Sequence, residues 1–190
     1  MAKALPIPGL TADMRYSDAA VCTIEVRAAE LFDHAAGVLD VSNIEAVHAM
    51  RVATRRLRSV LEFYEPCLDR DKLKPVLRQV CDLADALGQR RDPDVELEAL
   101  AQFAAAATPS ERPGIDRFVA KTSDQQMQAN GELSEMLEQI ERDDLRGRLR
   151  ELTEPQPTAT EVDSGQGEED PGQATEAGEP PAKSGWLRRR

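Results

Sequence analysis

The stretch VHAMRVATRRLRSVLEFYEP, from Val47 to Pro66, combines many apolar residues with one histidine and four arginines. At about 100° per residue, its apolar residues fall on one arc of a helix roughly 100° wide: Met50, Ala53, Leu57, Val60, Leu61 and Tyr64. A second arc, roughly 80° wide, holds the residues that we call the basic face: His48, Arg51, Arg55 and Arg58. Arg56 lies alone on the far flank. The stretch therefore predicts one amphipathic helix with a core side and a line of cations about 5 Å apart along its axis.

The rest of the chain up to about residue 152 also favours helices. Apolar residues recur at helical spacing, no segment alternates with the period of a half-buried strand, and aromatic residues make up 4% of the chain, which favours an aliphatic core. Capping and proline signals predict five helices: about Tyr16 to Leu39, Ser42 or Asn43 to Glu65, Asp71 to Gly88, Asp92-Pro93 to Ala107, and a long one through Ile115 and Ile140 that Gly131 bends. Because the connections are short, we expect an all-α antiparallel bundle.

The domain organisation follows from composition. Residues 1–15 form an N-terminal extension, residues 16–152 the helical domain, and residues 153–190 a tail rich in Pro, Gly and Glu. Such a tail buries too little apolar surface to offset the entropy of ordering, so we expect it to be disordered. Its last residues, WLRRR, are either a docking segment or a solvated end. The acidic part is either a solubilising tail or a tether that competes with an anion for the basic face.

The charge distribution excludes a polycation that coats nucleic acid. The net charge is −11, with −5 in residues 151–190 and −6 in residues 1–150, yet His48 to Arg91 holds ten bases and six acids. A local anion site inside an acidic protein therefore remains open.

The cations of the predicted helix lack acidic neighbours on their own helix. Arg51, Arg55 and Arg56 have no acid three or four positions away, whereas Arg58 has Glu62 at the stabilising spacing. The long helix nearer the C-terminus offers a contrast, because Glu138–Arg142 has this opposite-charge spacing. Acids from other helices could still pair the three arginines. Otherwise an anionic ligand is their expected partner.

Further basic residues follow along the chain. Lys74 and Arg78 share one face of the next predicted helix, and Arg90-Arg91 lies in a predicted turn before Asp92. In an antiparallel bundle these groups can converge with the basic face. The planar guanidinium group suits phosphate oxygens, and a row of such groups suits an extended polyanion better than one small anion.

Two motifs resemble those of the CHAD family, the conserved-histidine α-helical domain. VHAMRVATRRLRSVLEFY followed by LADALGQRRDPDV is similar to that family's His-x-x-Arg-Val-x-x-Arg-Arg-x-Arg helix and Leu-Gly-x-x-Arg-Asp turn, within about Ala19 to Leu152. The resemblance implies a helical fold whose basic groove binds inorganic polyphosphate, often at polyphosphate granules. The implied ligand-facing residues are His48, Arg51, Arg55, Arg56, Arg58 and Arg91; local geometry adds Lys74, Arg78 and Arg90.

The chain departs from the family in length. The usual domain is about twice as long and has two related bundles facing each other across the groove, whereas this sequence holds one basic motif. We therefore expect two chains to pair as a homodimer that rebuilds the groove.

The expected function is non-enzymatic binding of polyphosphate. An enzyme acting on phosphoanhydrides with His48 as acid or base, a nucleic-acid-binding protein and a helical protein-interaction module are the alternatives. The enzyme has weak support because the sequence has two histidines, no metal-ligand spacing and no glycine-rich phosphate loop. Nucleic acid is disfavoured because aromatic residues are scarce. We expect no cofactor and no metal, unpaired cysteines in a reducing compartment, no membrane segment, and a cytoplasmic location, in part at polyphosphate granules.

Overall fold

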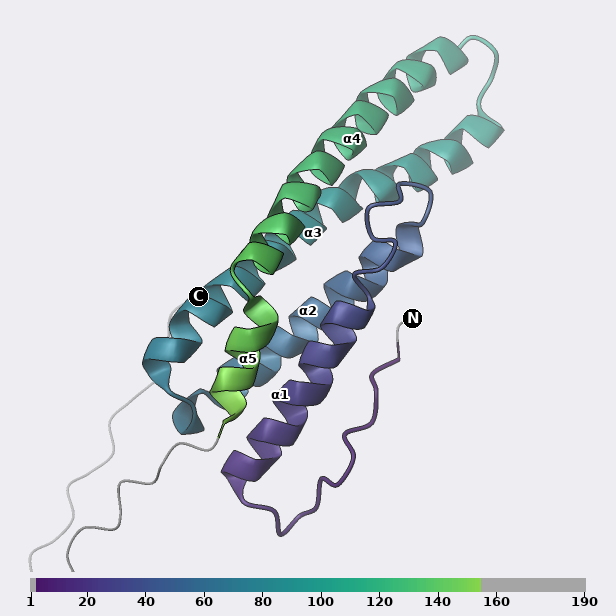
Figure 1. The fold of residues 1–190 in the computed structure, drawn as a ribbon. Coiled ribbons are helices and arrows are strands. Elements are labelled where there is room, and N and C mark those ends of the chain that lie inside the picture. Colours follow the sequence, from purple (N-terminus) through teal and green to yellow (C-terminus); the bar gives the residue numbers. More distant parts are fainter. Residues whose placement is uncertain (1–2, 155–190) are drawn as a thin grey trace, which may run out of the picture. The chain divides into compact units, whose positions relative to one another are not determined.

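The computed structural model describes residues 3–154, and every regular element in this range is helical. The elements are α1 (Tyr16–Asp33), α2 (Ile44–Phe63), a 3-10 turn η1 (Glu65–Cys67), α3 (Arg70–Ala106), α4 (Arg112–Arg142) and α5 (Leu145–Thr153) (Figure 1). The predicted all-α bundle of about five helices is confirmed. The predicted disordered tail lies outside the described residues from position 155 onward.

The helices pack around an aliphatic core. α2 lies between α1 and α3, α5 packs against α1 and α3, and α4 runs along α3 (Figure 1). The Tyr16 hydroxyl donates to the Phe63 carbonyl oxygen at 2.6 Å, which ties the start of α1 to the end of α2. α3 and α4 also extend past the other helices as a two-helix hairpin (Figure 1). Phe103 and Phe118, on this hairpin, are 61% and 63% exposed.

Helix α2 forms as its sequence predicts. The Asn43 side chain caps it by accepting from the Ala46 N–H at 3.2 Å, and η1, which contains Pro66, follows its end at Phe63. The predicted core side is buried at Met50, Ala53, Leu57, Leu61 and Tyr64, and Val60 is partly buried. The opposite side of α2 is therefore left for the basic face.

The prediction of two helices between Asp71 and Ala107 is wrong, because α3 is one helix that contains Gly88 and Pro93. Pro93 removes one backbone hydrogen bond, but it is buried, and an ion pair between Arg90 and Asp94 spans it. Side chains of α4 bind both members of this pair. These tertiary contacts override the local signal for a helix start at Asp92.

The start of α3 also differs from the prediction. Asp69 is its N-cap, accepting from the N–H groups of Asp71 at 2.9 Å and Lys72 at 3.3 Å. Asp71 is therefore the second helical residue, and Pro75 lies beyond the first turn.

Two further boundaries differ from those predicted. α1 ends at Asp33 instead of Leu39, because the chain turns through Gly37 at a φ of +76° and buries Val38. The long last helix runs through Gly131 but ends at Arg142, where Asp144 adopts a left-handed φ of 47° and caps α5. The Asp144 carboxylate accepts from the Gly147 N–H at 3.0 Å, and a β-carbon at Gly147 would collide with that carboxylate. A residue with a side chain at this position would therefore have to displace the capping carboxylate of Asp144.

Candidate anion-binding site

The basic face of α2 lies on the side turned away from the core. Arg51, Arg55 and Arg58 are exposed and His48 is half-buried. Within residues 3–154, neither Arg51 nor Arg55 forms an ion pair or a side-chain hydrogen bond. Arg58 does pair, with its Nε 2.8 Å from Glu62 Oε1. The basic face thus carries at least two guanidinium groups that no acid of the described chain neutralises.

Arg56 lies on the other flank of α2 and reaches α1. Its Nη1 is 3.9 Å from Oε1 of the buried Glu30, which also pairs with Arg27 at 2.5 Å and accepts from the Leu5 N–H. Burial alone would raise the pKa of Glu30, but the hydrogen bonds from Leu5 and Arg27 and the charges of Arg27 and Arg56 together lower that pKa. Glu30 is therefore held as a carboxylate, and Arg56 has the acidic partner from another helix that the sequence left open.

The basic face borders α3 in an antiparallel register. Arg51 Nε lies 4.0 Å from the position that a β-carbon on Gly88 would take. At the other end, the hydrogen bond with Glu62 raises the pKa of Arg58, and the charges of Cys81 and Asp85 in α3 raise it further. The segment from Arg51 to Arg58 in α2 thus runs alongside the segment from Gly88 back to Cys81 in α3. The same register continues toward Lys74 and Arg78 beyond Arg58, and toward Arg91 beyond Arg51.

Lys74 and Arg78 come together at the start of α3, as their spacing predicts. They border a surface hollow with five other residues: Glu65, Arg70, Leu73, Leu77 and Cys81. Arg70, which the sequence analysis missed, has its Nε 3.6 Å from Glu65 Oε1. Arg70 falls in the first turn of α3, and the misplaced helix start at Asp71 hid that position.

A second hollow brings three guanidinium groups together beside α2. It is lined by Ala4, Arg27, Arg55, Arg56, Ser59 and Val60. Arg27 donates from Nη2 to the Leu5 carbonyl oxygen at 2.9 Å, so the N-terminal segment covers part of this arginine. Arg27 was not among the basic residues predicted from the sequence. The available signal was a charged residue on an apolar helix face, three residues after Ile24 and four before Leu31.

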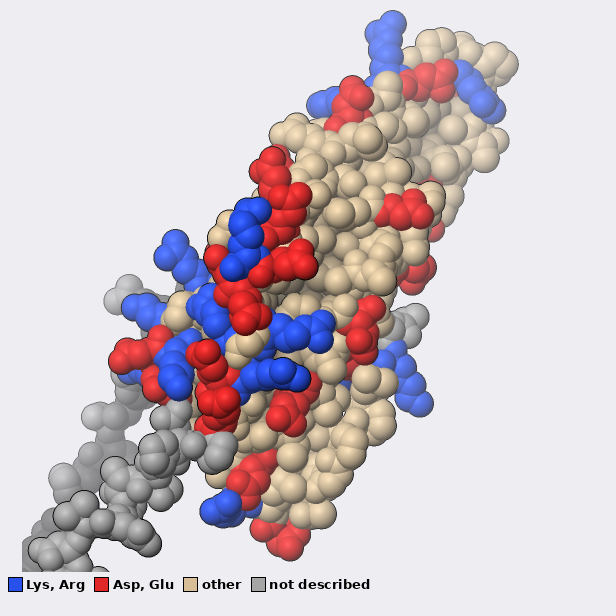
Figure 2. Space-filling model, in the orientation of Figure 1, with Lys and Arg blue, Asp and Glu red and all other residues tan. Residues whose placement is uncertain are grey.

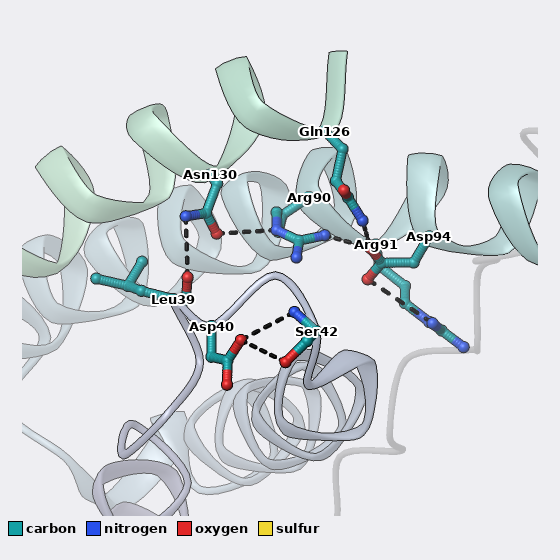
Figure 3. Close-up of polar contacts among 8 residues, drawn as sticks. All are labelled: Leu39, Asp40, Ser42, Arg90, Arg91, Asp94, Gln126 and Asn130. Carbon is teal, nitrogen blue, oxygen red and sulfur yellow. Dashed lines mark hydrogen bonds and ion pairs between the residues drawn. The ribbon is translucent and has the colours of Figure 1, made fainter. Parts of the chain in front are cut away.

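Arg90 and Arg91 belong to a cluster between α3 and α4 that we call the Asp94 cluster: Arg90, Arg91, Asp94, Gln126 and Asn130 (Figure 3). Arg90 has no exposed side-chain surface; its Nη1 pairs with Asp94 Oδ1 and its Nε donates to Asn130 Oδ1 at 2.9 Å. Arg91 is 18% exposed, with Nη1 3.8 Å from Asp94 Oδ2. The structure therefore places Arg91 at the edge of the protein and Arg90 inside it.

The face of the molecule that carries α4 and α5 has another group of charges. Figure 2 shows Lys and Arg gathered around α5 and interleaved with Asp and Glu. α5 supplies Arg146, Arg148 and Arg150, which the sequence analysis did not single out. Arg146 lies 4.2 Å from the centre of the Phe32 ring, and Arg148 donates to Gln79 Oε1 at 3.1 Å. Two of these arginines are thus engaged in packing the short helix onto α1 and α3.

Two other kinds of site are absent from the described part of the chain. No group of three or more His, Cys, Asp or Glu side chains there is arranged to hold a metal ion. No helix there is long and apolar enough to cross a membrane. Cys22, Cys67 and Cys81 are partly buried and unpaired.

Comparison with known proteins gives one match. No curated protein and no solved structure matches the sequence. The family model described as CHAD domain matches residues 23–182, a span that includes α2, α3 and the basic residues of both motifs. The chain therefore belongs to the CHAD domain family.

Proposed function

We propose that this chain binds inorganic polyphosphate without chemically altering it, through the basic face of α2 and the basic residues beside it. The observation that carries the proposal is the pair Arg51 and Arg55, exposed and without an acidic partner within residues 3–154. An unpaired surface arginine keeps its planar set of donors available for phosphate oxygens. Membership of the CHAD domain family supports the same ligand class.

The neighbouring residues extend the proposed site in two directions. Arg56 and the hollow it shares with Arg55 and Ser59 lie toward α1, and the hollow with Lys74 and Arg78 lies toward the start of α3. Arg91 completes the proposed set at the other end, whereas Arg90 is left out because it has no exposed surface. A strip of this kind suits an extended polyanion, which can contact several arginines at once.

His48 is proposed as a hydrogen-bond donor to the bound anion. It lies one turn before Arg51 on the basic face. Phosphate release from pure polyphosphate, measured with and without a divalent cation, tests the non-enzymatic assignment; release above the spontaneous rate would contradict it.

We further propose that two copies of the chain pair and so rebuild a two-sided groove, and that the protein associates with polyphosphate granules in the cytoplasm. The pairing rests on one basic motif standing where the usual family domain has two facing bundles. Light scattering with and without polyphosphate measures it, and a monomeric mass in both conditions would exclude it. Co-localisation of the fluorescently tagged protein with stained granules tests the location.

Titration with polyphosphates of defined length is the central experiment. We expect the observed affinity to fall steeply with salt, because bound cations release the counterions of the polyanion. Single-stranded RNA at matched salt is the comparison, and we expect it to bind more weakly. RNA binding as tight as polyphosphate binding would favour the nucleic-acid alternative instead.

A further inference from the structure

Asp94 is a buried carboxylate between two arginines that are adjacent in sequence. Its side chain has no exposed surface. Oδ1 pairs with Arg90 and accepts from Gln126 Nε2 at 2.7 Å, while Oδ2 faces Arg91 Nη1 at 3.8 Å. Figure 3 shows the guanidinium groups of Arg90 and Arg91 on opposite sides of this carboxylate. One acid thus holds one arginine inside the protein and one at its edge.

The two arginines differ in how many donors they have left. Arg90 donates to Asn130 and Asp94. Arg91 forms no hydrogen bond within the described residues, and its Nη1 is buried without a hydrogen-bond partner there. A guanidinium group has five N–H donors, so Arg91 is held by charge while its hydrogen-bonding capacity stays unused. Nη1 is buried against Asp94, and the 18% of the Arg91 side chain that is exposed is the part still able to bind an anion.

Arg91 is also near the basic face. It lies three residues, or about one helical turn, after Gly88, and Arg51 Nε lies over Gly88. Arg91 and Arg51 therefore border the same seam between α2 and α3.

We propose that Asp94 is a positioning residue for anion binding: it fixes the Arg91 guanidinium at the α2–α3 seam so that Arg91 can bind phosphate beside Arg51. The proposal rests on the proposed polyphosphate-binding function and adds a residue of opposite charge to that site. Gln126 supports the arrangement because its bond to Oδ1 fixes the carboxylate from α4.

The sign of one mutational effect separates positioning from simple electrostatics. A carboxylate near an anion site repels the anion, so removing its charge should raise affinity if Asp94 does nothing else. If Asp94 positions Arg91, removing the charge releases Arg91 and affinity should fall. The two roles of Asp94 thus predict opposite changes for Asp94→Asn.

The test is a double-mutant cycle with Asp94→Asn, Arg91→Gln and the double variant, using full-length protein and long-chain polyphosphate. We expect each single variant to lower affinity about tenfold, the loss of one charge-assisted contact. Each should also make the slope of log affinity against log salt shallower by about one, the change expected when one phosphate contact is lost. The double variant should bind no more weakly than either single variant, because both changes remove the same contact.

Asn130→Ala is the matched control. It removes a hydrogen bond of Arg90 and the bond from Asn130 Nδ2 to the Leu39 carbonyl oxygen, but it leaves Asp94 and Arg91 in place. We expect a lower melting temperature with an unchanged salt slope, so general destabilisation is distinguished from loss of the contact. If Asp94→Asn does not fold, Gln126→Ala replaces it in the cycle, and affinity should fall in an Arg91-dependent way.

Three outcomes would overturn the proposal. The first is a rise in affinity for Asp94→Asn, and the second is additive losses in the double variant. The third applies where Gln126→Ala replaces Asp94→Asn, and it is a Gln126→Ala variant with the affinity and salt slope of the wild type. If the wild-type protein binds polyphosphate but the losses in the double variant are additive, only the proposed role of Asp94 is contradicted. Wild-type protein that does not bind polyphosphate contradicts the proposed function as well.

Discussion

Arg51 and Arg90 lie on facing helices, and the two arginines have opposite environments. Arg51 is exposed on α2 and has no ion pair in the part of the chain that the structure describes. Arg90 has no exposed side-chain surface and binds an acid and an amide. A buried guanidinium group needs partners because an unpaired buried charge is very costly, whereas water solvates an exposed one. Position relative to the core thus separates arginines that stabilise the fold from arginines available to a ligand.

The largest effect is expected when Arg90, the buried arginine of the two, is removed. Arg90→Ala leaves the Asp94 carboxylate buried with its main partner gone, and the free energy of unfolding should fall by about 3–5 kcal/mol. Urea unfolding followed by circular dichroism measures this change. Arg142→Ala, which breaks the exposed pair with Glu138, is the control and should change stability by about 0.5 kcal/mol or less. An equal effect of the two substitutions would remove the distinction.

Charge reversal on the basic face should have the second-largest effect, and on affinity instead of stability. Arg51→Glu combined with Arg55→Glu should lower affinity for polyphosphate at least about 100-fold, because two attractive charges become repulsive. Helicity and melting should stay near those of the wild type, since both side chains are exposed.

Arg112→Glu combined with Arg117→Glu is the matched control for this double reversal. It makes the same change in net charge on exposed residues in the first part of α4. We expect a much smaller loss of affinity, measured by calorimetry at the same salt concentration. Equal losses in the two double variants would mean that net charge, and not the basic face, determines binding.

The acid of α1 that pairs with Arg56 should show an intermediate effect that depends on pH. Glu30→Gln should lower the free energy of unfolding by about 1.5–3 kcal/mol at neutral pH, because a charged acceptor of several donors is lost. The pKa of Glu30 is lowered in the folded protein, so its stabilisation is present above the unfolded value and is lost as pH falls through the folded one.

Unfolding of wild type and Glu30→Gln from pH 7 to pH 3 measures this dependence. The difference between the two proteins should be constant near neutrality and shrink in the acidic range. A difference that grows on acidification would contradict the ionised, hydrogen-bonded state of Glu30.

The smallest effect concerns Arg58, the member of the basic face that has an acid beside it. Glu62→Gln should release Arg58 and raise affinity for polyphosphate about twofold, with little change in stability because the pair is exposed. Calorimetric titration at low salt measures the rise. A fall in affinity would mean that Glu62 orients Arg58 toward the ligand.

The elements that the sequence predicted well are those for which several local signals indicate the same helix. In α2 the apolar period, the Asn43 cap and the proline at position 66 all indicate the same helix, and the structure has it within two residues. At Asp92-Pro93 the signals for a helix start were local, whereas the contacts that keep α3 continuous come from Gln126 and Asn130 of α4. Local sequence cannot indicate such partners.

The candidate site shows the same division. The lack of helical acids around Arg51 and Arg55 could be read from spacing and agrees with the structure, but the pairing of Arg56 with Glu30 joins two helices. Arg90 and Arg91 were predicted together because they are adjacent. In a continuous helix, adjacent residues point about 100° apart, so one of them entered the core and the other remained at its edge.

The Asp94 cluster also marks a boundary in local stability. The bond from Asn130 to the Leu39 carbonyl oxygen joins α4 to the loop after α1, and the main core takes in α4 from Leu133 onward but excludes Ile115. Nearer its tip, the α3–α4 hairpin is held mainly by its own two helices. Its backbone amides should therefore exchange with deuterium faster from Arg112 up to this cluster than beyond it, through openings that leave the basic face folded.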